Sequence, residues 1–312
     1  MFSTEAQTDP RTVQGDIVPD EPDFDDFSER FGASSLTLKI GPLEMQIDGL
    51  SSRQERDLAE RYRPFVVEGP VRPDVRIALR RARTDHFLRA PADGTVETYR
   101  MGCRRTDDHL SLWSYEFAGR LDRSERRAVL SIVEERGERF DRGLENFLRV
   151  LTAAYILEQG GMLLHASGVV RGGVAHLFFG PSGRGKTTVT LLSPGDVVLS
   201  DDLSLIVRNG ERFEAAGIPF GMAHHRTPDT RDSFPIASLN SLVQAPDVCR
   251  EPLTGARALA EICASLPFVM QETGQSRKAL DVAGRLLEAV PSYRLRFRKE
   301  PSFWDVIEGV AQ

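Results

Sequence analysis

The chain has 312 residues, enough for two domains, and its 40% hydrophobic and 28% charged residues are ordinary for a globular protein. Of the net charge of −6, −7 lies in residues 1–30, so the rest of the chain carries +1 and has no basic field that would hold a nucleic acid. No run of 18 apolar residues occurs, which excludes a membrane-spanning helix.

The first thirty residues contain nine acids, three prolines and few residues that form a core, which predicts a disordered tail over 1–30. They lack the basic-then-apolar order of a signal peptide. The three cysteines are scattered and form neither a disulfide framework nor a metal-binding pair. We therefore expect a cytoplasmic protein.

Residues 31–140 have the pattern of an α+β domain in which nothing indicates chemistry. The elements expected in it are strands over 36–40 and 43–47, a helix over 51–62, a strand over 74–79, and strands that end near 113–117, with turns at Asp93-Gly94 and Asp107-Asp108.

A second domain is predicted over 141–312. Apolar residues at helical spacing indicate a helix over 144–159 that Gly160-Gly161 ends. A strand over 163–170 and an apolar strand over 174–179 follow, joined by a tight turn. The second of these strands runs directly into a glycine-rich loop.

This loop matches the pattern GxxxxGK[ST] of a P-loop, with a strand before it and a helix after it. Glycines allow backbone N–H groups to turn around a phosphate, and the helix that opens at Lys186 adds its positive end. The loop predicts a nucleotide site that consists of Gly180, Pro181, Ser182, Gly183, Arg184, Gly185, Lys186, Thr187 and Thr188.

After a short helix that ends at residues 193–195, an apolar strand leads into Asp201 and Asp202. The strand is similar to a Walker B segment, which places carboxylates beside the phosphates at the mouth of a sheet. A hairpin over 203–216 follows, and its Asn209-Gly210 pair predicts a type I′ turn. Such a hairpin departs from the usual continuation of a GTPase or an ABC ATPase.

The order of His165, the P-loop and the Asp201-Asp202 pair resembles HPr kinase/phosphorylase. It resembles more closely the HPr-kinase-like serine kinases of some bacterial peptide-modification clusters, and more remotely the ATP-dependent phosphoenolpyruvate carboxykinases. The resemblance covers about residues 144–310. It implies an α/β fold: an HPr-kinase-like or phosphoenolpyruvate-carboxykinase-like C-terminal domain behind an N-terminal α+β domain.

The resemblance also implies the roles of individual residues, with ATP and Mg²⁺ as cofactors. Lys186 would bind phosphates, and His165 would sit beside the general base and orient it. One of Asp201 and Asp202 would be that base, while the other would help to hold Mg²⁺. The implied metal ligands are Thr187, Asp202 and Glu214.

Some features depart from the HPr kinases. The N-terminal region does not match their sensor domain, and the segment between Asp202 and Glu214 is too short for their substrate-capturing insertion. HPr is therefore not the expected acceptor, and the reverse phosphorylase reaction is not expected. The pair His224-His225 lacks a third metal ligand, so we predict no zinc site.

The function expected from the sequence is an ATP-dependent kinase that phosphorylates a serine-type hydroxyl on a protein or peptide. Two alternatives stay open: a kinase for a small molecule such as free serine, and a non-catalytic nucleotide-binding regulatory protein. We expect no nucleic-acid or membrane partner, while a homo-oligomer and the choice between ATP and GTP stay open.

Overall fold

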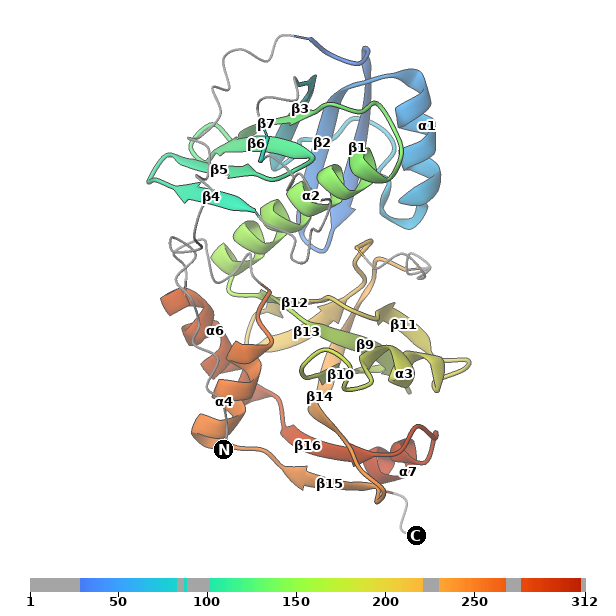
Figure 1. The fold of residues 1–312 in the computed structure, drawn as a ribbon. Coiled ribbons are helices and arrows are strands. Elements are labelled where there is room, and N and C mark those ends of the chain that lie inside the picture. The colour runs from blue at the N-terminus through green and yellow to red at the C-terminus, as the bar shows by residue number, and fades with distance from the viewer. Residues whose placement is uncertain (1–28, 83–86, 89–100, 221–229, 268–275, 310–312) are drawn as a thin grey trace.

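The computed structural model describes residues 29–82, 87–88, 101–220, 230–267 and 276–309. It is a mixed α/β protein dominated by two sheets that lie one above the other, with the long helix α2 running from the first sheet towards the second (Figure 1). The predicted α/β class is confirmed at this level. The predicted tail, the Asp93-Gly94 turn and His224-His225 lie outside the described residues.

The first sheet has seven strands in the order β1-β2-β3-β7-β6-β5-β4. Its elements are β1 Ser34–Ile40, β2 Leu43–Leu50, α1 Ser52–Arg61, the 3-10 turn η2 Arg63–Phe65, β3 Val75–Arg81, β4 Gly102–Arg105, β5 His109–Trp113, β6 Phe117–Asp122, β7 Arg127–Ile132 and α2 Glu138–Glu158.

Local sequence explains the first elements of this sheet. Alternate side chains of β1 and β2 are buried, as their alternating pattern predicts. Helix α1 begins after Ser51, whose side chain accepts a hydrogen bond from the backbone N–H of Gln54, while the Gln54 side chain accepts one from the Ser51 N–H. This capping box supplies partners that the first turn of a helix otherwise lacks. The predicted strands and helix between residues 36 and 79 are confirmed.

The hairpin of β6 and β7 is absent from the sequence prediction, although it forms the centre of the first sheet. Its turn contains no glycine or asparagine. Instead, Arg126 adopts a φ of 54°, in the left-handed region that non-glycine residues rarely enter. Because the turn lacks the Gly or Asn of the common two-residue hairpin loops, the sequence did not indicate a hairpin here.

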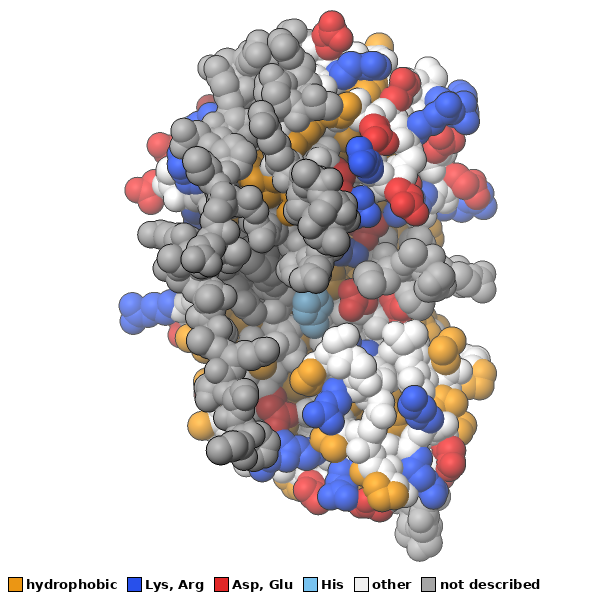
Figure 2. Space-filling model, in the orientation of Figure 1, with side chains coloured by type: hydrophobic (Ala, Val, Ile, Leu, Met, Phe, Trp, Pro, Cys, Tyr) orange, Lys and Arg blue, Asp and Glu red, His pale blue; other side chains and the backbone are white. Residues whose placement is uncertain are grey.

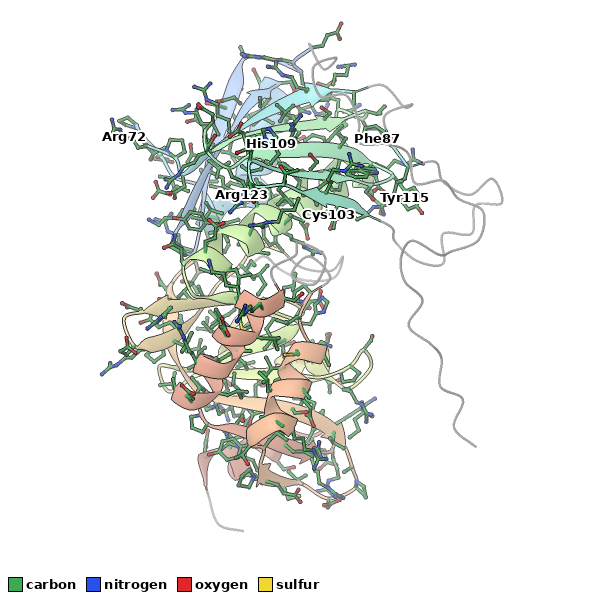
Figure 3. All side chains as sticks on the ribbon, turned by 90° about the vertical axis from the view of Figure 1, so that its left-hand side faces the viewer. Arg72, Phe87, Cys103, His109, Tyr115 and Arg123 are labelled. Carbon is green, nitrogen blue, oxygen red and sulfur yellow. The ribbon has the colours of Figure 1, made fainter. Side chains whose placement is uncertain are left out.

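Helix α2 begins at Glu138, six residues before the predicted start, so the predicted domain boundary between 140 and 141 lies within its first turn. Its apolar face packs on the first sheet, where Phe147 fills the space over Gly119. At the other end, Arg123 donates to the Glu158 carboxylate at 2.8 Å, and Figure 3 shows Arg123 beside α2. The helix therefore ties the first sheet to the chain that enters the second.

The second sheet has the order β11-β9-β10-β14-β13-β12-β8, with β16 beside β14 and β15 beside β16. Its elements are β8 Met162–Leu164, β9 Ala166–Arg171, β10 Val174–Phe179, α3 Lys186–Leu191, β11 Val197–Ser200, β12 Ser204–Asn209, β13 Arg212–Ala216, β14 Ser233–Gln244, β15 Cys249–Pro252, α4 Gly255–Ala264, α6 Ser276–Ala289, β16 Ser292–Phe297 and α7 Phe303–Glu308.

Two predictions about this sheet are wrong. The strand expected over 163–170 is broken at His165, because β8 pairs with β12 whereas β9 pairs with β10 and β11. The hairpin turn after β12 is not type I′, which needs two residues with positive φ. Asn209 pairs with Arg212, and of the two residues between them only Gly210, with a φ of 62°, has a positive φ.

Both sheets contribute to one hydrophobic core that includes Leu38 and Leu130 of the first sheet and Leu177 and Leu205 of the second. The turn between β1 and β2 approaches β12 closely, since a Cβ on Gly41 would lie 2.7 Å from a methyl group of Leu205. None of the helices in the described ranges is both long and apolar enough to cross a membrane.

Candidate active site

The candidate site lies at one edge of the second sheet, where four strands end. Strands β10, β14 and β16 are parallel to one another, and β11 runs in their direction because both β10 and β11 are antiparallel to β9. The segments that follow β10 and β11 therefore leave the sheet at the same edge (Figure 1). The carboxyl ends of parallel strands are where open α/β sheets bind their ligands.

The glycine-rich loop 180–185 leaves β10 at this edge and has the backbone that its glycines predict. Gly180, Gly183 and Gly185 have φ values of 144°, 79° and 108°, which side chains with a Cβ rarely allow. Phe297, at the end of β16, packs against the loop, and a Cβ on Gly185 would lie only 2.6 Å from its ring. The side chain of Gln244 donates to the Gly183 carbonyl at 2.9 Å. Neighbouring strands thus hold the loop in its shape.

Lys186 opens helix α3 and turns its ammonium group back over the loop. Its Nζ donates to the Gly180 carbonyl at 2.9 Å. Burial lowers the pKa of Lys186 below its ordinary value, and the carboxylate of Asp202 partly opposes that shift. Thr187 follows in the first turn of α3 and is exposed, while Thr188 is half-buried.

Asp201 and Asp202 form the turn after β11, and Ser200 fixes this turn. The Ser200 hydroxyl accepts from the backbone N–H of Asp202 at 3.3 Å and from that of Leu203 at 3.0 Å. Asp201 is buried, with 7% of its surface exposed, whereas Asp202 is half-buried. The charge of Asp202 acts on both Lys186 and His165. Asp202 is therefore close enough to both groups for its charge to affect them.

His165 occupies the break between β8 and β9, directly before Ala166, which pairs with the last residue of β10. Its backbone N–H donates to the Ser265 carbonyl at 2.8 Å, which holds the break in place. Burial lowers the pKa of the half-buried imidazole; Asp202 opposes this shift, and the positive charges of Lys186 and Arg149 add to it. His165, Lys186 and Asp202 thus lie close enough for their charges to interact, and the roles assigned to them stay predictions.

Glu214 lies elsewhere. On the hairpin of β12 and β13 it pairs with Val207, and Val207 lies five residues after Asp202 in the chain. Its carboxylate accepts hydrogen bonds from Asn209, at 3.1 Å, and from Ser233. The hydrogen bonds of Glu214 shown here run to β12 and β14, and its role as a metal ligand stays a prediction.

Arg149 is a member of the site that sequence analysis did not identify. It lies on α2, where its Nη2 donates to Glu145 at 2.5 Å and its guanidinium stands 5.9 Å from the centre of the Phe220 ring. In the sequence it is one of many arginines on a helix, and no motif contains it. Arg149 comes close enough for its charge to act on His165 because α2 packs beside β8.

The residues present fit a nucleotide with a divalent cation. The open loop offers left-handed glycines and an ammonium group to phosphates, and a threonine hydroxyl and a carboxylate are oxygen ligands of the kind that Mg²⁺ prefers. No three His, Cys, Asp or Glu side chains gather as metal ligands within the described part of the chain. Mg²⁺ in nucleotide sites is held by one or two protein ligands together with phosphates and water.

Fold and site define a mixed α/β protein with a glycine-rich loop, a lysine and an acid-histidine pair at one sheet edge. The model of the family described as SynChlorMet cassette protein ScmC matches residues 145–312, and the chain belongs to this family. The match begins within α2 and includes every residue of the site. A search of the curated proteins finds no match to the chain.

Proposed function

We propose that the protein is an Mg²⁺-dependent ATP kinase that transfers the γ-phosphoryl group to a serine-type hydroxyl on a protein or peptide. The observation that carries this proposal is the common edge of the second sheet, at which the loop, Lys186, Asp202 and His165 meet. A loop alone would support binding, whereas an acid opposite the lysine supports a reaction.

In this proposal the loop and Lys186 bind the phosphates of ATP. The ammonium group neutralises charge that grows on the phosphate oxygens during transfer. Its bond to the Gly180 carbonyl keeps it over the loop, where phosphates would replace that carbonyl as its partner. Thr187 and Asp202 are the residues that would hold Mg²⁺, which supplies further positive charge to the phosphates when it is bound.

The acceptor side of the site consists of Asp202, Asp201 and His165. Asp202 would accept the proton of the acceptor hydroxyl, or orient that hydroxyl if Asp201 takes the proton. Because burial and two neighbouring cations favour the neutral form of His165, its imidazole can exchange a hydrogen bond with the carboxylate and fix its orientation. Asp202 therefore has two candidate tasks, base and metal ligand, which the experiment below separates.

We also propose that the second sheet and its helices have an HPr-kinase-like fold. An HPr-kinase-like arrangement is supported by a strand that leads into the loop, an acid-bearing strand at the sheet edge and the hairpin of β12 and β13 that follows it. The description of the family names a cassette and no reaction. The acceptor has to be identified by experiment.

The proposal is tested by transfer of label from [γ-³²P]ATP to a panel of serine-containing peptides, a cell lysate and free serine, each with Mg²⁺. We expect label on a protein or peptide, and loss of at least about 100-fold in kcat for Asp202→Asn with binding of ATP retained. If Asp202→Asn is rescued by Mn²⁺, its main task is to hold the metal ion.

The matched control is Asp196→Asn, because Asp196 lies at the start of β11 and pairs with Arg171, away from the loop. It should transfer label at the wild-type rate. Label on free serine alone would favour the small-molecule kinase. Binding of ATP without transfer to any acceptor would favour the regulatory protein, and a fully active Asp202→Asn would contradict the assigned chemistry.

A further inference from the structure

A chain of ion pairs leads from the first sheet to the candidate site. Arg61, at the end of α1, donates to Asp141 and to Glu145 of α2, each at 2.9 Å. Glu145 also accepts from Arg149, four residues further along the helix, at 2.5 Å. The Glu145 carboxylate, with 9% of its side chain exposed, is thus shared between two guanidinium groups.

Arg149 is the member of this chain furthest along α2, the helix that packs against β8, and β8 ends directly before His165. Its Nε is buried without a hydrogen-bond partner in the described structure, and its guanidinium lies beside the ring of Phe220, which is 2% exposed. Its charge acts on two groups on opposite sides: Tyr62 at the end of α1, and His165 at the edge of the second sheet. Arg149 therefore stands between the first sheet and the site.

We propose that Arg149 is a positioning residue of the phosphoryl-transfer site, and that the ion pairs Arg61–Glu145–Arg149 make its placement depend on the first sheet. This inference rests on the proposed function. Two features support it: a shared, nearly buried carboxylate fixes both guanidinium groups at once, and a rigid helix carries the contact from one sheet to the other.

The physical reason is the charge that Arg149 brings. A guanidinium cannot lose its proton, so one positive charge stays beside the imidazole whatever the pH. Removing that charge changes the electric field at His165 and removes the cation beside the Phe220 ring. The phosphates themselves are held by the loop and Lys186, so the binding of ATP should not depend on Arg149.

The test compares kcat and KM for ATP in Arg149→Met, Arg149→Lys, Glu145→Gln and Arg61→Met. We expect Arg149→Met to lower kcat about tenfold with KM for ATP changed less than about twofold, and Arg149→Lys to recover part of the loss. Glu145→Gln and Arg61→Met should lower kcat about threefold. Arg61 has this effect although it lies at the end of α1, beside the first sheet.

Arg142→Met is the matched control. Arg142 lies on the same helix and pairs with the buried carboxylate of Glu116 at 2.6 Å, but Glu116 belongs to the turn between β5 and β6. Arg142→Met therefore removes a similar ion pair on the same helix, but one that contacts the turn between β5 and β6. Equal losses of kcat in Arg142→Met and Arg149→Met would overturn the inference, and so would an unchanged kcat in Arg149→Met.

A readout without catalysis separates this inference from the proposed function. The ring resonances of His165, observed by NMR at one fixed pH, should shift in Arg149→Met, Glu145→Gln and Arg61→Met and stay in place in Arg142→Met. If the wild type transfers no phosphoryl group but these shifts occur, the proposed function fails and the connection stands. If Arg149→Met moves the resonances but Glu145→Gln and Arg61→Met do not, the placement of Arg149 does not depend on the first sheet and that part of the inference is refuted.

Discussion

At the scale of single residues, His176 is buried among charges in a way that makes stability depend on pH. It lies on β10, and its Nδ1 is 2.8 Å from the hydroxyl of Ser238, which also accepts from Asn240. That hydroxyl can give its own hydrogen to Nδ1 only while the ring is neutral. Burial and the positive charges of Arg250 and Arg171 lower the pKa of His176 to about 4, against a slight opposing effect of Asp196.

We therefore predict that the free energy of unfolding falls as the pH is lowered from about 6.5 to about 4. Over this range the histidine of the unfolded chain, with its ordinary pKa of 6.5, binds a proton, whereas the folded ring stays neutral. Because the ring keeps some contact with water, the expected loss from this group is about 2 kcal/mol. Urea unfolding at several pH values measures it.

The variant His176→Gln isolates this contribution, since carboxylates titrate in the same range. The wild type should lose about 2 kcal/mol more than His176→Gln between pH 6.5 and 4. Equal slopes in the wild type and His176→Gln would refute the prediction.

Single residues of the candidate site could be predicted only where a local sequence pattern contains them. Lys186 and Asp202 belong to local patterns whose spacing alone indicates their chemistry, and His165 came from the resemblance. Arg149 could not be predicted, because its place beside the imidazole depends on how α2 docks on another element. Glu214 was expected from an analogous position, yet the β12–β13 pairing directs it to Asn209 and Ser233.

At the scale of elements, the C-terminal helix α7 packs against the helix that follows the loop. Trp304 of α7, 2% exposed, donates through its indole N–H to the Ser193 hydroxyl at 3.0 Å, and Ser193 donates to the Val189 carbonyl of α3 at 2.7 Å. The Trp304 ring also meets the edge of Phe178 on β10, and Arg171 lies over it at 4.3 Å. One side chain thus connects α7, α3 and the strand that leads into the loop.

The two tryptophans of the chain give a matched pair for testing this contact. Trp113 of β5 is buried to a similar degree, at 4%, but its indole N–H has no hydrogen-bond partner in the described structure. Trp304→Phe should therefore cost about 3 kcal/mol of unfolding free energy, and Trp113→Phe about 1 kcal/mol less, because the latter removes a donor that is already unsatisfied. Urea unfolding of both variants measures the difference; a larger cost for Trp113→Phe would contradict the assigned bond.

Element predictions succeeded where the local signal and the tertiary structure agree. Alternation in β1 and β2, the capping box of α1 and the glycines around β10 each specify their element. The break at His165 could not be predicted from the local sequence, because it arises when the chain leaves β12 to pair with β10 and β11. Pairing partners far apart in sequence decide such features.

At the scale of the whole molecule, the two sheets share one core and one long helix. The part of the chain that matches the family begins within α2, and the first sheet lies before it. On the face drawn in Figure 2, acidic and basic side chains of the described residues are interspersed, which agrees with the near-neutral charge after residue 30. In the proposed coupling, the first sheet would act on the site through the ion pairs of Arg61 on α1 and Glu145 on α2.

The central claim is that the loop and Lys186 hold the phosphates of a nucleotide, and calorimetric titration of the protein with Mg²⁺·ATP tests it most directly. We predict one site per chain, and an affinity at least about tenfold weaker for Lys186→Ala. Lys39→Ala removes a lysine that pairs with Glu44 on the first sheet and should bind like the wild type. The claim would be contradicted by a wild type that binds no nucleotide, or by equal affinities of the wild type and Lys186→Ala.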